Sequence, residues 1–586
     1  MARFCGLASA RANPDRAAAM ANALQSGTSV QLSTGAAERL TFAAGTTMGS
    51  LPAAVTSTDE RTGRVALFAG YLLERPAGEN HAEMLLSCCE DDACLAALNG
   101  IFAAAVWDPR DDTLVLVTDR WGMRPLYWAH VEDGIAFGSS IRSVVAAGVD
   151  ADLDVHALEE TLGAGFALGQ RTLWSAVRRV EPATRLTMRG RSVGTTHYWR
   201  WPAAGDERVE DVGFVEGAAA IFRNTIDELA RRTERPVCLL SAGYDSRRIV
   251  LALAGAGANA EAYTASAPFA QRYTIDVPVA VEVCRRLGLS ITTTPLPTPH
   301  ETDRMAEAAG ALLDYETEEG VLLMPLLSKL PAGGTNFDGI GGDRLLGDFF
   351  YELPMSRVEG LHPTQLARRL FPTDPRSMLT PDLAAGISVP FQVRASAAIG
   401  AMPSDPNRFA SFLMRTRMRR LVGLFGCNLL EARVDSVFPY LDTRLADYVL
   451  RFDPALRAAK DMQGIALSHL YPEFDDVPTS HDRPEAIDGR YLQPIGDWAK
   501  RYEQTAIVYG ARRVLDTPDF ADLLAPRIRR MLRTIAATRF LGKLARPLHR
   551  RAWIAPRLGR LASWYQAARD PQRHADRIDR AVKLFS

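Results

Sequence analysis

The residues with the clearest chemical potential lie in a short turn between a predicted strand and a predicted helix. The strand Pro236–Leu240 leads into Ser241-Ala242-Gly243-Tyr244-Asp245-Ser246, and a helix is predicted over Arg247–Ala254. Small side chains let backbone N–H groups and a helix N-terminus approach phosphate oxygens, and the two serines add hydroxyl donors. Asp245 would repel a phosphate directly, so we expect it to hold a Mg²⁺ ion that bridges phosphates.

A second glycine-rich turn with an aspartate follows further along the chain. It reads Phe337-Asp338-Gly339-Ile340-Gly341-Gly342-Asp343-Arg344. Ligands of parallel sheets bind outside the carboxyl ends of the strands, so the two turns are expected to hold one Mg·pyrophosphate between them. A helix N-cap is the alternative interpretation of Asp343.

The elements around these turns indicate an α/β protein. Residues 1–200 contain short strand-like runs separated by Gly, Asp and Pro turns, which predicts a β-rich α+β domain. The polar stretch Trp201–Val209 is interpreted as a linker. After it, the strands Pro236–Leu240 and Glu261–Ser266 alternate with the helices Val212–Arg232 and Asp276–Leu287, which predicts a parallel sheet. Helical patterns dominate beyond residue 356.

Composition excludes several classes of protein. The chain has 586 residues, of which 47% are hydrophobic and 23% charged, so it is not disordered, collagenous or a disulfide scaffold. No apolar run is long enough to span a bilayer, and residues 1–14 lack a signal-peptide core, so a cytoplasmic location is expected. The seven cysteines show no metal-ligand spacing, and Cys88, Cys89 and Cys94 are interpreted as ordinary buried thiols.

The end of the chain is strongly basic. Residues 527–586 carry 16 Lys and Arg against three acidic residues, and their apolar residues recur at near-helical spacing. We expect a helical region that packs on the acidic body of the same chain. An acidic peptide or partner protein is the next interpretation, and nucleic acid is the least favoured.

Taken together, these motifs resemble the asparagine synthetase family, whose pyrophosphate loop usually reads SGGxDS and is followed by SGEGxDE. Leu98–Ala103, followed by Asp119–Tyr127, resembles the family's N-terminal amidotransferase-like domain. Glu431–Val434, with Pro439–Asp442, resembles its EARVPFLD segment, and Glu261–Ser266 takes the place of the second nucleotide-binding strand. The resemblance covers roughly residues 1–480 in the same order.

The resemblance implies a fold and three regions. Residues 1–205 would form an Ntn-hydrolase-like α+β domain, a degenerate glutamine amidotransferase. Residues 206–525 would form an adenine-nucleotide α-hydrolase-like parallel α/β domain that carries the pyrophosphate loop. Residues 526–586 would form the basic helical C-terminal region.

The resemblance also implies roles for individual residues, with ATP and Mg²⁺ as cofactors. The implied roles are pyrophosphate binding by Ser241, Gly243, Asp245 and Ser246; adenine or ribose contact by Leu240 and Ala265; approach to the nucleotide by Asp338 and Gly339; shared Mg²⁺ ligation by Asp245 and Asp343; and support of amine attack by Glu431. In the family's reaction a carboxylate attacks ATP, pyrophosphate leaves, and an amine displaces AMP to form an amide.

The chain departs from the family in both halves. Glutamine-dependent members use an N-terminal cysteine, whereas Cys5 follows four residues, and Ala69-Gly70-Tyr71 replaces the glutamine-binding NGE. Arg39 is the one retained glutamine-site candidate, so the first domain is interpreted as a structural remnant. Ala242, Ile340 and Arg344 replace family residues in the turns. The catalytic lysine expected after EARV is missing between Lys460 and Lys500, which leaves Lys460 or Arg483 as candidates.

Without glutaminase chemistry, the amine must come from the substrate or from a second substrate. The favoured interpretation is macrolactam formation in a lasso-peptide precursor, with a leader peptidase and a leader-binding protein as further candidate partners. Beta-lactam formation is the other branch of the family that fits this logic. A glutamine- or ammonia-dependent asparagine-synthetase-like enzyme that acts on a sugar or small-molecule carboxylate is the neighbouring alternative. A catalytically inactive binding protein with this fold is the alternative from another class.

Overall fold

The computed structural model describes most of the chain. The described residues are 2–10, 13–25, 30–37, 39–46, 55–73, 80–202, 205–270, 272–317, 320–346, 360–403, 407–454, 456, 462–537, 554–570 and 575–578.

Two six-stranded antiparallel sheets make up most of the first 200 residues. The first has the order β10-β8-β9-β1-β3-β2 and the second β12-β11-β7-β6-β5-β4. The strands of the first are β1 Ala2–Ser9, β2 Gln31–Ala37, β3 Leu40–Thr46, β8 Tyr127–Val131, β9 Gly134–Gly138 and β10 Arg178–Arg179. Those of the second are β4 Thr56–Thr58, β5 Val65–Leu72, β6 Gly100–Asp108, β7 Thr113–Thr118, β11 Thr184–Arg189 and β12 Ser192–His197.

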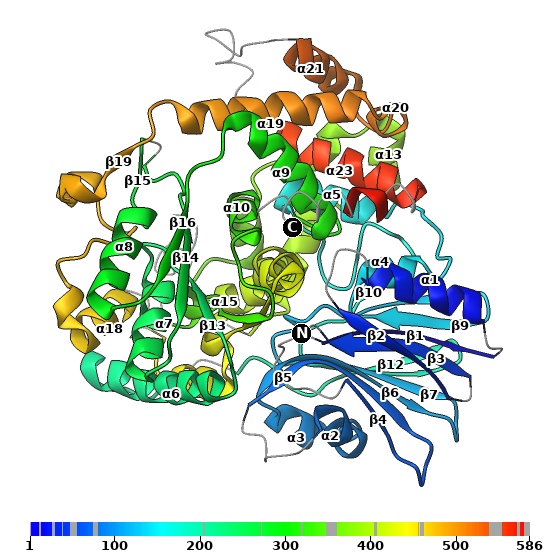
Figure 1. Ribbon diagram of the computed structural model, residues 1–586. Coiled ribbons are helices and arrows are strands. Elements are labelled where there is room, and N and C mark those ends of the chain that lie inside the picture. The colour runs from blue at the N-terminus through cyan, green and yellow to red at the C-terminus, as the bar shows by residue number, and fades with distance from the viewer. Residues whose placement is uncertain are drawn as a thin grey trace.

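The two sheets face each other, with helices on both outer sides (Figure 1). α1 (Pro14–Gln25) and α4 (Ile141–Val145) pack on the first sheet, and α2 (His81–Cys88) and α3 (Asp92–Ala97) lie beside the second. Phe4, Leu67 and Phe137 belong to the hydrophobic core between the sheets. Because both faces of the second sheet are covered, β5, β6 and β7 are buried along their whole length. The predicted β-rich α+β region is confirmed.

Two of the cysteines differ from the expectation of free thiols. Cys88, the last residue of α2, forms a disulfide with Cys94 in α3. The short turn between the helices brings their Cα atoms to 5.5 Å, a separation that suits a disulfide. The interpretation as free thiols is therefore wrong for this pair, whereas Cys89 is free and buried.

A five-stranded parallel sheet forms the second half, as the alternation of strands and helices predicts. Its order is β16-β14-β13-β17-β18, with β13 in the centre. The strands are β13 Pro236–Leu239, β14 Glu261–Ala265, β16 Ile291–Thr294, β17 Gly334–Phe337 and β18 Val434–Val437. The first helices around it are α6 Asp211–Arg231, α7 Tyr244–Gly255, α8 Asp276–Leu287 and α9 Pro299–Leu312. Since β14 and β17 both pair with β13, the turns that follow these strands share one edge.

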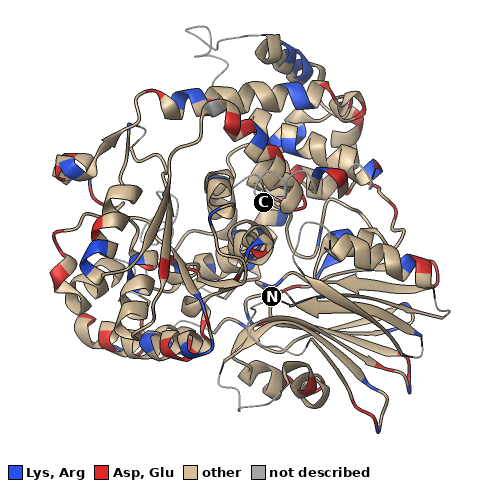
Figure 2. Cartoon of the chain, in the orientation of Figure 1, with Lys and Arg blue, Asp and Glu red and all other residues tan. Residues whose placement is uncertain are grey.

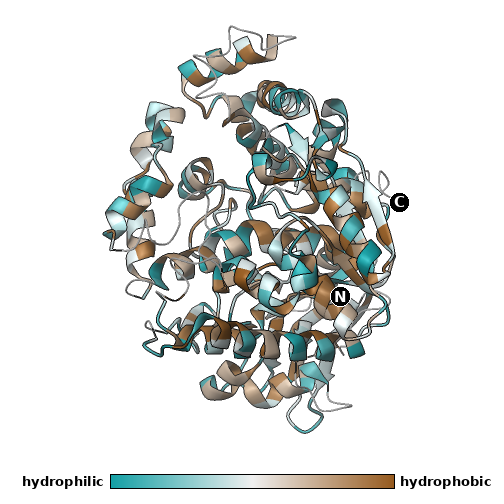
Figure 3. Ribbon diagram, turned by 90° about the vertical axis from the view of Figure 1, so that its left-hand side faces the viewer, coloured by the Kyte–Doolittle hydropathy of each residue, from teal (hydrophilic) through white to brown (hydrophobic). Residues whose placement is uncertain are grey.

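Helices dominate the chain from residue 360 onward, as the sequence predicts. They are α12 Pro363–Leu370, α13 Pro381–Gly386, α14 Phe391–Gly400, α15 Asn407–Leu413, α16 Thr443–Arg451, α18 Met462–Leu470, α19 Trp498–Leu515 and α20 Pro518–Ala521. Two π-helices, η4 (Met414–Val422) and η5 (Phe425–Leu429), follow α15. Many helices carry both hydrophobic and hydrophilic residues (Figure 3). No helix in the described ranges has the length and apolar character needed to cross a membrane.

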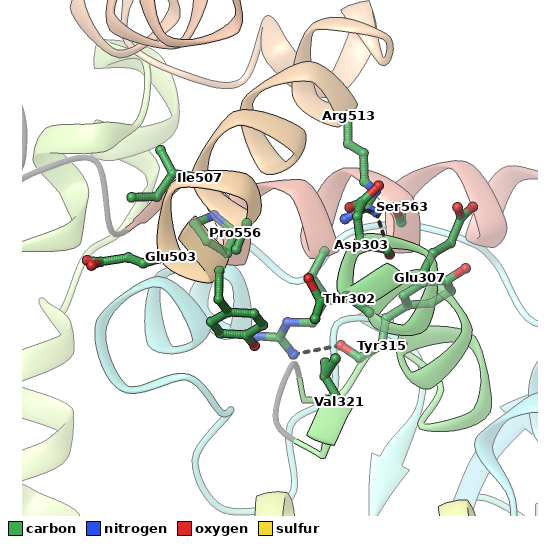
Figure 4. Close-up of a pocket in the computed structure, with 15 residues that line it drawn as sticks. Thr302, Asp303, Glu307, Tyr315, Val321, Glu503, Ile507, Arg513, Pro556 and Ser563 are labelled. Carbon is green, nitrogen blue, oxygen red and sulfur yellow. Dashed lines mark hydrogen bonds and ion pairs between the residues drawn. The ribbon is translucent and has the colours of Figure 1, made fainter. Parts of the chain in front are cut away.

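The basic C-terminal region packs on the body where the structure describes it. α23 (Ile554–Arg569) is mostly buried against α19, and its Trp564 ring lies 5.1 Å from that of Trp174. α9, α19 and α23 enclose a cavity of about 250 Å³, in which Arg513 pairs with Asp303 (Figure 4). α21 (Pro526–Ala537) buries Ile528, Leu532 and Ile535 and carries several basic residues (Figure 2). Residues 538–553 lie outside the described ranges.

The segments that resemble the family's motifs form the contact between the two halves. The buried Asp442, which caps α16, accepts hydrogen bonds from Asn99 Nδ2 at 2.9 Å and from Thr225 Oγ1 at 2.5 Å. Trp121 Nε1 donates to the Leu441 carbonyl at 2.7 Å, and Phe438 N donates to the Tyr71 hydroxyl at 2.8 Å. One hydrophobic cluster also contains side chains from both halves, including Tyr71, Trp121, Phe214 and Leu441. The two halves of the chain therefore pack around a common hydrophobic cluster.

Asp442→Ala should lower the free energy of unfolding by about 3 kcal/mol, because it removes the acceptor of the buried Asn99 amide and Thr225 hydroxyl and the side-chain cap of α16. Urea unfolding followed by circular dichroism measures the loss. Glu216→Ala, at an exposed position of α6, is the matched control and should cost less than about 0.5 kcal/mol. Equal stability of the two variants would contradict the role of Asp442 at the contact.

Candidate functional site

The first glycine-bearing turn connects β13 to α7 at the carboxyl edge of the parallel sheet. Gly243 occupies the N-cap of α7 and has no side chain to cap the first-turn amides. Ser246 Oγ accepts from Ser241 N at 3.0 Å and lies 3.0 Å from Ser241 Oγ. Gly243 N donates to Ser241 Oγ at 3.2 Å. The turn thus gathers hydroxyl and amide groups around an uncapped helix start, which is a suitable environment for an anion.

Residues distant in the sequence hold this turn in place. Asp276, at the start of α8, accepts a hydrogen bond from Ala242 N at 2.8 Å. Ser480 N donates to the Ala242 carbonyl at 3.0 Å, and the rings of Tyr244 and His481 stack at 4.5 Å. The segment that carries Ser480 and His481 is itself fixed, because the buried Arg247 guanidinium donates to the carbonyls of Val477 and Pro478.

The second glycine-rich turn lies directly against the first. A Cβ atom added at Gly342 would overlap the Asp245 carboxylate, and one added at Gly339 would lie 3.0 Å from Asp245 Cβ. Gly341 has a φ of 97°, a conformation that side-chain-bearing residues rarely adopt. The glycines of this turn therefore permit the close approach of the two loops.

Asp245 and Asp343, the two aspartates predicted to share a cation, are close enough for the charge of Asp343 to affect the pKa of Asp245. Burial, and then the Asp343 carboxylate, raise the pKa of Asp245 well above its usual range. Gln463 Nε2 donates to Asp245 Oδ1, and Arg344 Nη2 lies 2.8 Å from Asp343 Oδ2. Gly341, and not Asp343, occupies the N-cap of α11 (Gly342–Leu345), so the alternative interpretation of Asp343 is wrong.

The donor set fits a hard divalent cation with additional ligands from a nucleotide. The carboxylates of the two contacting turns are the oxygen ligands that Mg²⁺ prefers, and this ion is usually held by one or two carboxylates plus substrate phosphates. No group of three or more His, Cys, Asp or Glu side chains suited to a metal occurs among the residues that the structure describes. The remaining ligands would have to come from the substrate and from water.

The other predicted nucleotide contacts lie at the same sheet edge. Ala265 is the last residue of β14, and Asp338 follows β17 and accepts from Ile340 N at 3.0 Å. Burial raises the pKa of Asp338 to about 6. Leu240 N donates to the Tyr263 carbonyl at 2.8 Å, but the Leu240 side chain is buried in the hydrophobic core. A contact of Leu240 with adenine would therefore have to use its backbone.

The three candidates for catalysis fall in different places. Both carboxylate oxygens of the buried Glu431 pair with guanidinium groups of the first half: Oε2 lies 2.7 Å from Arg3 Nη2, and Oε1 contacts Arg124. Arg483 is exposed, in the segment that lies over the first turn. Lys460 lies outside the described residues. The catalytic roles of all three stay predictions.

Sequence reasoning missed three residues that complete the site. Gln463, at the start of α18, bonds to Asp245 and also accepts from Arg248, whose guanidinium lies 5.3 Å from the Phe222 ring centroid. Asp276 holds the first turn. Arg248 adjoins the motif and could have been considered, whereas Gln463 and Asp276 reach the site only through tertiary packing.

Cys5 is a core thiol, as expected, whereas Arg39, the one candidate expected to remain from a glutamine site, pairs with another residue. Cys5 is a buried residue of β1, and burial raises the pKa of its thiol to about 12. Arg39 pairs with Asp112 on the surface. A thiol with this pKa is protonated near neutral pH, and only the thiolate is an effective nucleophile.

Comparison with known proteins supports the resemblance to the asparagine synthetase family. A glutamine amidotransferase domain family matches residues 75–199. "Asparagine synthetase [glutamine-hydrolyzing] 3" of Bacillus subtilis (strain 168) is 31% identical over 28% of this chain, and "Asparagine synthetase [glutamine-hydrolyzing] 1" of the same organism is 28% identical over 33%. The matched regions span 26% and 30% of those relatives, respectively, less than a third of their length.

Two weaker similarities were also found. "Amidase chyE" of Penicillium rubens is 26% identical over 26% of this chain and 23% of its own. The solved structure "Structure of the allosteric regulatory enzyme of purine biosynthesis" gives a TM-score of 0.26 at 12% identity, covering 51% of this chain and 81% of that one. This structural similarity is too low to bear on the fold.

Gly342→Ala tests the contact between the turns. The added methyl group would displace the Asp245 carboxylate, and we expect turnover to fall by about 100-fold or more, since small misplacements at a reacting centre have effects of that size. Gly255→Ala, where a Cβ would meet nothing within 4 Å, should retain turnover. Full activity of Gly342→Ala in a steady-state assay would show that the loops need not touch.

For a nucleotide bound at this sheet edge, the pKa of Asp338 predicts a pH-dependent affinity. Below pH about 6 the carboxyl becomes protonated and loses an acceptor, so affinity for ATP should fall as the pH drops from 8 to 5. Isothermal titration calorimetry with a non-hydrolysable ATP analogue measures this step. Asp338→Asn should bind more weakly at pH 8 and should lack the step; an unchanged pH profile would contradict the assignment.

Proposed function

We propose that this protein is an ATP-dependent amide synthetase that adenylates a carboxylate and joins it to an amine. The observation that carries the proposal is the contact of the two glycine turns, which brings Asp245 and Asp343 together beside an uncapped helix start. The similarity to asparagine synthetases supports an amide-forming ligase, and the stacked and parallel sheets are those expected of an Ntn-hydrolase-like domain joined to a pyrophosphate-loop domain.

In this proposal the chain's residues bind and orient the nucleotide. Ser241, Ser246 and the first-turn amides of α7 hold the outer phosphates, and Asp338 accepts from the ribose. Asp245 and Asp343 hold Mg²⁺, which when bound neutralises charge on the departing pyrophosphate. Gln463 and Arg248 fix the Asp245 carboxylate. The Ser480–His481 segment lies over the turn and shields an acyl-adenylate from water.

The amine in this proposal does not come from glutamine hydrolysis at Cys5. The thiol is buried and protonated, and it lies within a strand rather than at an exposed chain end. An amine carried by the substrate itself fits this arrangement, so we favour macrolactam formation in a lasso-peptide precursor. An asparagine-synthetase-like reaction on a small carboxylate is the second candidate, favoured by the relatives' names.

ATP–pyrophosphate exchange tests the proposal. Exchange that depends on an acidic precursor peptide supports the macrolactam synthetase, and exchange with free aspartate supports the second candidate. Absence of both exchange and ATP binding would leave only an inactive binding protein.

Asp245→Asn and Asp343→Asn should each reduce exchange by at least about 100-fold, because each removes one charged ligand of the cation. Cys5→Ala is the control, and its exchange rate should stay within about twofold of wild type, since a buried neutral thiol has no part in the step. Near-normal exchange in either aspartate variant would refute the shared-cation site, and its loss in Cys5→Ala would restore a role for the thiol.

A further inference from the structure

A second pocket, of about 470 Å³, lies where the two halves of the molecule meet. Leu168, Glu181, His197 and Trp201 line it from the first half. Residues of α14, α15 and the π-helix η4 line it from the second half. None of its lining residues belongs to the two glycine turns, so it is separate from the proposed nucleotide site.

Two arginines line this pocket beside one carboxylate and the neutral polar residues Ser411 and Thr416. Arg415 and Arg200 both line it, against the single carboxylate of Glu181, whose Oε1 is 3.8 Å from Arg415 Nη2. The Arg415 side chain is only 22% exposed, and among the residues that the structure describes it donates no hydrogen bond. A largely buried guanidinium with five N–H donors, whose one carboxylate partner lies at 3.8 Å, has donors left for an incoming anion.

The walls of the pocket are apolar. Leu168, Trp201, Met402 and Phe412 contribute carbon surface, and Ala398 and Ala401 leave room beside them. A hydrated inorganic anion would use only the arginines, whereas a ligand with an apolar body would also bury this surface. The volume lies within the range of pockets that hold small organic molecules.

We propose that this pocket binds a small organic anion, a carboxylate on an apolar body, with the carboxylate held by Arg415 and Arg200. The planar guanidinium group pairs with carboxylates in a two-point geometry, and such charged hydrogen bonds are stronger than neutral ones. The site goes beyond the proposed function, because it uses neither the nucleotide turns nor a divalent cation.

The π-helix η4 carries Arg415 and a second arginine, Arg417. η4 carries Arg415 into the pocket, and two positions later it carries Arg417. Burial raises the pKa of Asp343, and the charges of Arg344 and then Arg417 oppose that rise, so Arg417 acts on the second turn. π-Helical segments are rare and occur frequently at functional sites.

Calorimetric titration of the full chain, without nucleotide, tests the proposal. The probes are phenylbutyrate, its neutral analogue phenylbutanol, and inorganic phosphate. We expect saturable binding of phenylbutyrate below about 10 mM, and binding of the other two at least about tenfold weaker. Absence of saturable binding of phenylbutyrate would overturn the proposal. Phosphate binding as tight as that of phenylbutyrate would show that the apolar walls do not bind the ligand.

Two variants keep the test independent of folding. Arg415→Gln removes the charge, and Ala398→Trp fills the pocket while both arginines remain; each should weaken phenylbutyrate binding by at least about tenfold. Arg501→Gln, on an exposed arginine of α19, is the matched control and should bind as wild type does. Unaltered melting temperatures confirm the fold of each variant. Wild-type affinity in both Arg415→Gln and Ala398→Trp would show that the probe binds elsewhere.

Discussion

The candidate site depends on the absence of side chains where the second turn meets Asp245. Gly339 and Gly342 pack so closely on this aspartate that a single methyl group would have to move it, and Gly341 adopts a left-handed conformation beside them. This contact brings the loops after β13 and β17 together and places two carboxylates in each other's field. In the proposed function, a divalent cation would relieve the resulting repulsion.

The surrounding structure holds Asp245 and the first turn in place. Gln463 and Arg248 hold Asp245 from one side, while Asp276 and Ser480 hold the backbone of the first turn. None of these contacts is local in sequence. The turn itself is short, so its geometry is determined by three distant segments that converge on it.

The sequence predicted those parts of the structure that follow from local chemistry and topology. The strand, turn and helix around Asp245 were predictable from an apolar run followed by small residues, and the contact of the two turns followed from the rule for parallel sheets. The roles of Gln463 and Asp276 were not predictable, because no local pattern marks a residue that reaches its partner through packing. The burial of the Leu240 side chain was not predictable either, because it depends on the orientation of the strand. The disulfide of Cys88 depends in the same way on the geometry at the end of a helix.

The contact between the two halves determines what loss of the first half would cost the second. Trp121 and Tyr71 of the first half lie in the same hydrophobic cluster as Phe214 and Leu441 of the second, and Glu431 has its charge balanced by Arg3 and Arg124 across the contact. Deleting the first half would expose that apolar surface and leave a buried acid without counter-charges. The first half therefore stabilises the second by packing and by charge, whatever chemistry it carries itself.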